Sequence, residues 1–454
     1  YEQTLAHVNT NSKPTDLKIT DMRFVDIVGA PMHCTLLRIE TNQGITGYGE
    51  VRDGASKLYA QMLKRFLIGE NPCNIDKIFR RIKQFGGQSR QAGGVCGVEL
   101  ALWDIAGKAY GIPVYQMLGG KFRDKVRMYC DTDVDGKDTG LNMGDALKKR
   151  IEKHGYTMLK MDLGINQLWD VEGGLCAPVG FLEQYGYTAK MAREAKARGD
   201  KAAARWWANR NYDVNNIAHP FTGIHITTKG FDYLENYVKE VRSVIGYEIP
   251  LSIDHFGHIG VEDCIKLANR LENYNMCWLE DMIPWQLTDQ YVRLHNASTT
   301  PIATGEDIYL LENFKPLLDN RAVSIIHPDI LSSGGIYETK KIGDYAEECG
   351  VAMALHMAET PVACLAAVHV AAATNNFLGL EFHSNDVDWW SDMVKDTEKP
   401  KIVDGFMAVP EKPGIGIDEL DDEVLAEHIH PEIPGLWEST DEWNDWISHD
   451  RLWS

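Results

Sequence analysis

The sequence lacks the features that would suggest a membrane or a nucleic acid as partner. No stretch approaches 18 consecutive apolar residues, so no membrane-spanning helix is expected. The formal charge is −20, with 46 basic residues against 66 acidic ones. A chain with this excess of negative charge has no basic stripe to offset repulsion by DNA, RNA or an anionic membrane. We therefore expect a small molecule as the partner.

Cysteines are few, and their spacing shows no pairing pattern. The nine are an odd number with no CxxC pair, and several fall in expected strands or helices. This distribution indicates reduced thiols and argues against a disulfide framework. A reducing compartment, the cytoplasm, is the expected location. The chain starts at Tyr1 without a Met, so removal of a leader would also be compatible with the sequence.

The bulk composition is that of a globular enzyme. Apolar residues make up 44% of the chain and charged residues 25%. The 454 residues are enough for an α/β barrel of about 250 residues and a second domain.

Six ionisable residues between positions 254 and 381 recur at nearly even steps of 26, 26, 23, 27 and 25 residues. Each closes a short apolar run, and helix-like segments such as 260–273 and 336–349 lie between the runs. This alternation predicts βα units of a parallel sheet. An α/β barrel places its active site at the carboxyl ends of its strands. The six residues are Asp254, Glu280, Glu306, Asp329, His356 and Glu381.

The first three members of this series predict a metal site. Asp254, Glu280 and Glu306 end three successive predicted strands, and three converging carboxylates would repel one another without a cation. Oxygen ligands favour Mg²⁺ over Zn²⁺. The alternative is three unrelated carboxylates at strand ends, and the even register favours the metal.

The last three members predict acid–base chemistry. A carboxylate such as Asp329 on one ring nitrogen of His356 would fix the tautomer and make the other nitrogen a base near neutral pH. A hard cation beside such a base suits removal of a proton α to a carboxylate. Glu381 could hydrogen-bond the developing oxyanion if it stays protonated.

The second predicted barrel strand, 156–162, carries two further candidates. Lys160 and Asp162 are two residues apart, so both point to one face of the strand. We expect this to be the barrel interior, beside the metal ligands, because Leu159 and Met161 supply an apolar opposite face. A solvated pair at the strand end is the alternative. The first barrel strand is expected at 126–130.

An insertion of 166–230 follows this strand at the predicted catalytic mouth. It contains an expected polar helix, 187–204, followed by Trp206 and Trp207. The two Trp residues could form a wall over the pocket, a subunit contact or local packing.

The flanking segments predict a small α+β domain. Residues 16–28 and 35–41 read as antiparallel strands, with a hairpin turn at 42–44. The loop 29–34 is expected to be a connector, and its functional alternative is a lid whose substrate contact is His33. Residues 96–109 predict a packed helix that Gly111 and Pro113 end. The Trp-rich tail after Pro434 is expected to dock on this domain or on a neighbouring subunit.

These motifs, in this order and spacing, resemble the enolase superfamily and within it the mandelate racemase subgroup. The resemblance covers nearly the whole chain apart from the insertion. The segments that carry it are Gly44–Glu50, Ala101–Lys108, Leu118–Gly120, Leu279–Asp281, Thr304–Glu306, Pro328–Asp329, Gly334–Gly335, His356 and Glu381.

The resemblance implies a modified (β/α)7β barrel of the TIM type with an α+β N-terminal capping domain. The expected boundaries are 1–122 for the capping domain, 123–398 for the barrel and 399–454 for a C-terminal segment that completes the cap. The resemblance also implies that Asp254, Glu280 and Glu306 ligate Mg²⁺. It further implies that His356 is the base oriented by Asp329, and that Glu381 acts on the substrate. Loops near 29–34 and 51–55 would select the substrate, and a homo-oligomer is expected.

Two departures from the family pattern narrow the expected reaction. Strand 2 commonly ends Lys-x-Lys with the second Lys as a second base, but here that position is Asp162, which argues against simple racemisation. Sugar-acid dehydratases often carry a His two residues after the first metal ligand, but here that position is Phe256. The neighbouring His255 and His258 are therefore the candidate acids.

The sequence thus predicts a carbon–oxygen lyase that dehydrates a sugar acid, an aldonate or aldarate, to a 2-keto-3-deoxy acid. His356 itself is a third candidate for the acid. An epimerase, racemase or cycloisomerase using the same enediolate is the first alternative. An inactive metal-binding homologue is the second.

Overall fold

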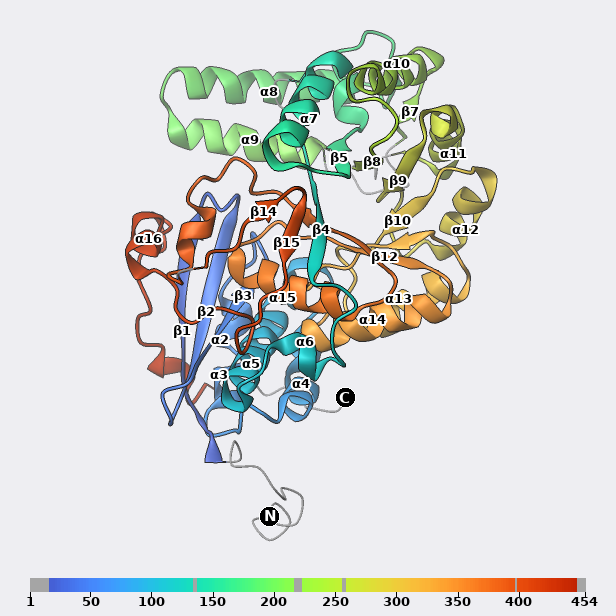
Figure 1. Cartoon of the computed structure of the whole chain (residues 1–454). Helices are drawn as coiled ribbons and strands as arrows, with labels where there is room; N and C mark the ends of the chain where they lie inside the picture. Colours follow the sequence, from blue (N-terminus) through green and yellow to red (C-terminus); the bar gives the residue numbers. More distant parts are fainter. Residues whose placement is uncertain (1–15, 134–136, 216–222, 255–258, 397, 447–454) are drawn as a thin grey trace. The chain divides into compact units, whose positions relative to one another are not determined.

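The computed structural model describes residues 16–133, 137–215, 223–254, 259–396 and 398–446. The chain divides into two compact units. The first comprises Tyr1–Cys130, Gly305–Leu318 and Ile326–Ser454, and the second comprises Asp131–Thr304 and Asp319–Ile325. Figure 1 shows the elements of both units. Among the described residues, every helix is either too short or too polar to cross a bilayer.

The first unit begins with a three-stranded antiparallel sheet. Its strands β1 (Ile19–Val28), β2 (His33–Thr41) and β3 (Thr46–Val51) lie in sequence order. Gly44, with a φ of +75°, turns the chain between β2 and β3 as the hairpin signal predicts. The helices of this region are α2 (Leu58–Gln61), α3 (Lys64–Leu67), α4 (Ile75–Ile82), α5 (Gly93–Tyr110) and α6 (Val114–Met117).

Helix α5 contains the predicted helix 96–109 and is buried along nearly its whole length. It ends at Gly111, whose φ of +72° is the left-handed conformation that closes a helix. The helix lies directly on β3 because glycines face each other there. A Cβ added to Gly97 would lie 2.4 Å from the backbone oxygen of Glu50, and one added to Gly49 would lie 1.9 Å from the oxygen of Gly97.

The first unit also holds one arc of the barrel. Strands β12 (Ala352–Leu355), β13 (Phe377–Phe382) and β4 (Lys125–Cys130) run parallel, and β15 (Phe406–Ala408) pairs antiparallel with β4 and with β14 (Ile402–Val403). The strand predicted at 126–130 is therefore confirmed. The helices here are α13 (Leu311–Asp319), α14 (Ile336–Glu348), α15 (Pro361–Ala373) and α16 (Asp422–Glu427).

The second unit holds the other arc. Strands β5 (Leu159–Asp162), β8 (Leu251–Asp254), β9 (Met276–Glu280) and β10 (Ile302–Thr304) are parallel neighbours. Asp162 is paired in register with Asp254, so both strands end at the same level. The helices between and around these strands are α7 (Gly140–His154), α10 (Thr228–Ile245), α11 (Val261–Leu271) and α12 (Thr288–Ala297).

The strand order makes the fold an eight-stranded parallel barrel. The order is β4, β5, β8, β9, β10, β11 (Ile325–Ile326), β12 and β13, and a pairing of β13 with β4 closes the sheet. A helix follows each strand except β13, as expected of a (β/α)7β barrel. The predicted fold class, with a separate N-terminal domain of antiparallel strands and helices, is confirmed.

The insertion differs from the sequence prediction. A single helix over 187–204 is wrong, because two helices, α8 (Phe181–Ala197) and α9 (Lys201–Asn215), form a hairpin there. Gly199, with a φ of +74°, makes the turn that periodicity alone does not reveal. A pair of two-residue strands, β6 (Leu175–Cys176) and β7 (His225–Ile226), joins the ends of the insertion.

The adjacent Trp residues both lie in α9 but have different surroundings. Trp207 meets Tyr187 of α8 edge to face at 5.5 Å between ring centroids, which is local packing inside the hairpin. Trp206 is 52% exposed and lies under the guanidinium of Arg210.

The C-terminal segment docks on the antiparallel sheet, one of the two placements that the sequence predicts. Trp437 is buried, its backbone N–H donates to the oxygen of Phe24, and its indole N–H donates to Asp422 at 2.7 Å. Thr440 accepts from the buried ammonium group of Lys64 at 2.8 Å. All nine cysteines lie in the described residues, and none of them is joined in a disulfide.

Two glycine substitutions test this packing. Gly97→Ala should lower the free energy of unfolding by about 2–3 kcal/mol, because its methyl group meets the backbone of β3. Gly186→Ala, on an exposed stretch of α8 with nothing within 4 Å, should raise it by about 0.5–1 kcal/mol. Urea unfolding of both variants measures the difference. Equal effects of the two changes would contradict the close approach of α5 to β3.

Candidate active site

Acidic side chains gather at the carboxyl ends of the strands in the second unit. Asp254 is the last residue of β8 and Glu280 the last of β9, and both are buried. Lys160 of β5 is 1% exposed, and its ammonium group lies 2.7 Å from Oδ2 of Asp254 and 3.1 Å from Oε1 of Glu280. Lys160 therefore points inward beside these carboxylates, as the sequence predicts.

A third carboxylate, Asp281, belongs to the same cluster. One oxygen each from Asp254, Glu280 and Asp281 lies within 4.8 Å of the others. Neighbouring donors orient two of these groups. The indole N–H of Trp278 donates to Oε2 of Glu280 at 2.7 Å, and the hydroxyl of Thr304 donates to Oδ1 of Asp281 at 2.6 Å. Three buried or half-buried carboxylates with fixed oxygens fit the oxygen ligation that Mg²⁺ prefers.

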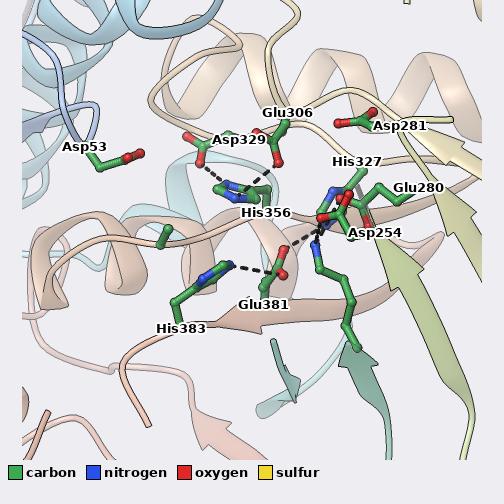
Figure 2. A network of polar contacts seen from close by, with 12 residues as sticks. Asp53, Asp254, Glu280, Asp281, Glu306, His327, Asp329, His356, Glu381 and His383 are labelled. Atoms are coloured by element: carbon green, nitrogen blue, oxygen red, sulfur yellow. Dashed lines mark hydrogen bonds and ion pairs between the residues drawn. The ribbon is translucent and has the colours of Figure 1, made fainter. Parts of the chain in front are cut away.

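The first unit contains the predicted His–Asp pair. His356 follows β12 and Asp329 follows β11, and an isolated bridge joins their backbones. Nδ1 of His356 lies 2.6 Å from Oδ2 of Asp329, and its Nε2 lies 3.3 Å from Oε2 of Glu306 (Figure 2). Because an ionised Asp329 only accepts hydrogen bonds, the proton of a neutral His356 belongs on Nδ1. Nε2 then carries the lone pair that a base needs.

Arg52 is a residue of this network that the sequence analysis missed. It follows β3, its side chain is 1% exposed, and its guanidinium ion-pairs with Asp329. Further carboxylates lie at 2.8 Å (Asp53), 3.5 Å (Glu306) and 3.7 Å (Glu359). One cation thus compensates several buried acids. Arg52 lies in the loop 51–55, which the sequence predicts to select the substrate, and three of its four carboxylate partners lie more than 250 positions away along the chain.

The electrostatic consequences differ between two of these acids. Burial alone would raise the pKa of Asp329, but the charge of Arg52 and the hydrogen bond to His356 outweigh it and hold the pKa below its usual range. Asp329 is therefore ionised at neutral pH. Burial, followed by repulsion from Asp329, raises the pKa of Glu359 well above its ordinary value. The pKa values of the two carboxyls are thereby shifted in opposite directions.

Glu381 lies near the end of β13, and both of its carboxylate oxygens contact neighbouring side chains. His383 contacts Oε1 through Nε2 at 3.2 Å. The hydroxyl of Tyr129 donates to Oε2 at 3.2 Å, and Nε2 of His327 lies 3.3 Å from the same oxygen. Figure 2 shows Glu381 beside His383. Tyr129 and His327 also contact each other at 2.5 Å, so the carboxylate belongs to a continuous polar chain.

The remaining predicted residues have varied positions. Asp162 ends β5 and is half-buried. His33 opens β2, and its Nε2 lies 3.0 Å from Asp26, whose carboxylate also accepts from Thr35 and Lys57. His255 and His258, the candidate acids, lie outside the described residues.

Other residues of the network carried only weak sequence signals. Asp281 adjoins a predicted ligand, His327 lies two residues before Asp329, and His383 lies two residues after Glu381. Residues two positions apart in a strand point to the same face, and Asp281 directly follows Glu280, so these three residues could have been predicted as part of the site. Tyr129 is the last but one residue of β4 and carries no such sequence signal.

Models of the two domains of one protein family match this chain. The family model for the mandelate racemase / muconate lactonizing enzyme N-terminal domain matches residues 2–119, and the enolase C-terminal domain-like model matches residues 142–424. A D-xylonate dehydratase from Haloferax volcanii is 31% identical over 434 residues, which cover 94% of this chain and 92% of that protein. A D-galactonate dehydratase family member from Pantoea ananatis, RspA, is 28% identical over 89% of this chain and 92% of its own.

Solved structures agree with these matches. A mandelate racemase/muconate lactonizing enzyme-like protein from Rubrobacter xylanophilus superposes with a TM-score of 0.74 at 27% identity, covering 92% of this chain and 98% of that chain. The family models together span more than half of the residues, and the strand-end residues that carried the resemblance lie within them. The chain therefore belongs to the mandelate racemase/muconate lactonizing enzyme family of the enolase superfamily.

Proposed function

We propose that this enzyme is a Mg²⁺-dependent dehydratase of a sugar acid, an aldonate or aldarate. The observation that carries the proposal is the buried His356–Asp329 pair, whose 2.6 Å contact leaves Nε2 as the basic nitrogen. Relatives named D-xylonate dehydratase and D-galactonate dehydratase support this reaction class and a carboxylate substrate.

The proposed reaction is a β-elimination of water. Nε2 of His356 removes the proton on the carbon α to the substrate carboxylate, and the β-hydroxyl leaves with a proton from an acid. The resulting enol tautomerises to a 2-keto-3-deoxy acid. Asp329 stabilises the imidazolium that forms, because its carboxylate faces Nδ1 and is kept ionised by Arg52. Glu381 is assigned to the substrate carboxylate or enolate.

Mg²⁺, when bound, would neutralise the charge that develops on the substrate carboxylate. Asp254 and Glu280 would hold it, and their clustering with Asp281 supports a cation there. Glu306 follows β10. It is proposed as the third ligand because it is the next acidic residue after Asp254 and Glu280 in the series of strand ends along the chain. Lys160 offsets part of the negative charge of this cluster.

Three residues are proposed as the acid that protonates the leaving hydroxyl: His255, His258 and His356 itself. His356 can serve twice if proton removal and hydroxyl departure occur on one face of the substrate, since its protonated form is the acid. Asp162, in place of the second strand-2 lysine of the family pattern, argues against a two-base racemase.

A screen of a sugar-acid library with Mg²⁺ in D₂O tests the proposal. A dehydratase gives a keto acid that semicarbazide detects. An epimerase or racemase instead returns isomers labelled with deuterium at the α-carbon, and a cycloisomerase gives an isomer without keto acid. An inactive homologue would give no product and no exchange with any member of the library.

Removal of one predicted ligand should separate metal binding from folding. Glu280→Gln should weaken Mg²⁺ binding by at least about tenfold, because a neutral amide replaces a charged oxygen ligand. Titration calorimetry with Mg²⁺ alone measures this without turnover. Glu262→Gln, a change at an exposed ion pair with Arg293, is the matched control and should bind Mg²⁺ normally. Equal affinities in the two variants would remove Glu280 from the metal site.

The same titration tests the third ligand. The proposal expects Glu306→Gln to weaken Mg²⁺ binding as much as Glu280→Gln does, and Asp281→Asn to have a smaller effect because Thr304 already occupies one of its oxygens. If Asp281→Asn weakened Mg²⁺ binding more than Glu306→Gln did, Asp281 would take the place of Glu306 as the third ligand.

A further inference from the structure

We propose that the first unit carries a second metal site, made by His356, Glu381 and His383, which takes a zinc-like ion instead of magnesium. One ligand atom from each residue lies within 4.8 Å of the other two. Nε2 of His383 is already 3.2 Å from Oε1 of Glu381, and the rings of His356 and His383 have centroids 5.5 Å apart (Figure 2). Strands β12 and β13 are parallel neighbours, so this closeness is built into the barrel.

The type of ligand selects the ion. Two imidazoles and one carboxylate form the three-ligand set of many zinc sites, which keep a fourth position open for water or a small molecule. Mg²⁺ prefers oxygen ligands and is disfavoured here. In a tetrahedral site with bonds of about 2.0–2.1 Å, ligand atoms are about 3.4 Å apart. The His383–Glu381 distance already matches, and modest side-chain rotations would bring in His356.

Outer contacts orient His356 and Glu381, as metal sites require. Asp329 faces Nδ1 of His356 at 2.6 Å and so directs Nε2 to act as the ligand. Tyr129 and His327 contact Oε2 of Glu381, which leaves its orientation fixed for ligation through Oε1. His383 lies just past the end of β13 and its side chain is 18% exposed, so a rotation of this ring can bring it and His356 to one ion.

An ion at this site would inhibit the enzyme. Ligation would use the lone pair on Nε2 of His356, the same pair that takes the substrate proton in the proposed reaction. The inhibition rests on the proposed function, whereas the binding of the ion does not. Zinc is therefore expected to act at this site even when Mg²⁺ is saturating, because the two ions differ in their preferred ligands.

The binding test uses the full chain in excess Mg²⁺ and titrates Zn²⁺ against a chromogenic chelator. Wild type should hold one tight zinc ion, and His383→Gln should weaken its affinity at least about 100-fold. His225→Gln is the matched control, because this exposed histidine also contacts a carboxylate, Asp263, but lies in the second unit. X-ray absorption at the zinc edge should show two imidazole ligands in wild type and one in His383→Gln.

If zinc bound to wild type and to His383→Gln with equal affinity, the proposed zinc site would be wrong. Glu381→Gln is a second variant that should also weaken zinc binding, so a folding defect in one variant does not decide the result. With a substrate in hand, the zinc inhibition constant should rise in His383→Gln by the same factor as the dissociation constant. If no sugar acid is turned over but zinc binding still depends on His383, the metal site stands and the proposed reaction fails.

Discussion

Replacing His356 with Asn should lower kcat/KM for the sugar-acid substrate by about 10⁴-fold, the upper end of what a general base contributes. The amide of Asn can still donate to Asp329, so the buried carboxylate keeps a partner where Nδ1 lies 2.6 Å away in wild type. The substitution removes only the basic nitrogen. Mg²⁺ affinity should be unchanged, because the proposed ligands are the carboxylates Asp254, Glu280 and Glu306.

A matched change elsewhere separates loss of the base from general damage. His295→Asn alters a half-buried histidine on α12 and should leave kcat/KM within about twofold of wild type, as surface substitutions usually do. Steady-state kinetics and Mg²⁺ calorimetry on both variants complete the comparison. If His356→Asn kept activity within tenfold of wild type, another residue would have to be the base.

Replacing Arg52 with Met should lower the free energy of unfolding by about 3–5 kcal/mol, because breaking a buried ion pair leaves uncompensated charge. The side chain is 1% exposed and faces Asp53, Glu306, Asp329 and Glu359. Chemical denaturation at pH 7 measures the loss. Arg80→Met, at an exposed i,i+4 pair with Asp76, is the control and should leave the free energy of unfolding close to that of wild type.

The pH dependence of this loss has a defined sign. The pKa values of Asp53 and Asp329 are lowered in the folded protein, so these acids contribute stability above their unfolded values, and the contribution fades as pH falls through the folded ones. Arg52 is the principal charge that lowers both. The deficit of Arg52→Met should therefore be largest near pH 7 and shrink only as the pH falls below the ordinary Asp value of 3.8 towards the lowered folded values. A deficit independent of pH would show that Arg52 acts through packing alone.

Much of the barrel could be predicted because its signal is local and repeated. Asp254, Glu280 and Glu381 each lie at or next to the end of a short apolar strand, and their near-even spacing predicts that these strand ends share one rim before any contact is known. The His356–Asp329 contact follows from the same register, since β11 and β12 are consecutive strands of the barrel.

What could not be predicted depends on single turns or distant contacts. The helical hairpin α8–α9 was read as one helix, because a lone Gly199 interrupts an otherwise helical composition. Arg52 gave no signal, because its ion pairs with Asp329 and Glu359 join residues far apart in the sequence. The hydrogen bond from Tyr129 to Glu381 could not be predicted for the same reason, since β4 and β13 pair only when the sheet closes into a barrel.

The most direct test of the account follows product formation and α-hydrogen exchange together, with Mg²⁺, in D₂O, for wild type and His356→Asn. The account predicts a semicarbazide-reactive 2-keto-3-deoxy acid from at least one aldonate or aldarate with wild type, and neither product nor exchange with the variant. Recovery of deuterium-labelled isomers without any keto acid, or undiminished product with His356→Asn, would contradict it.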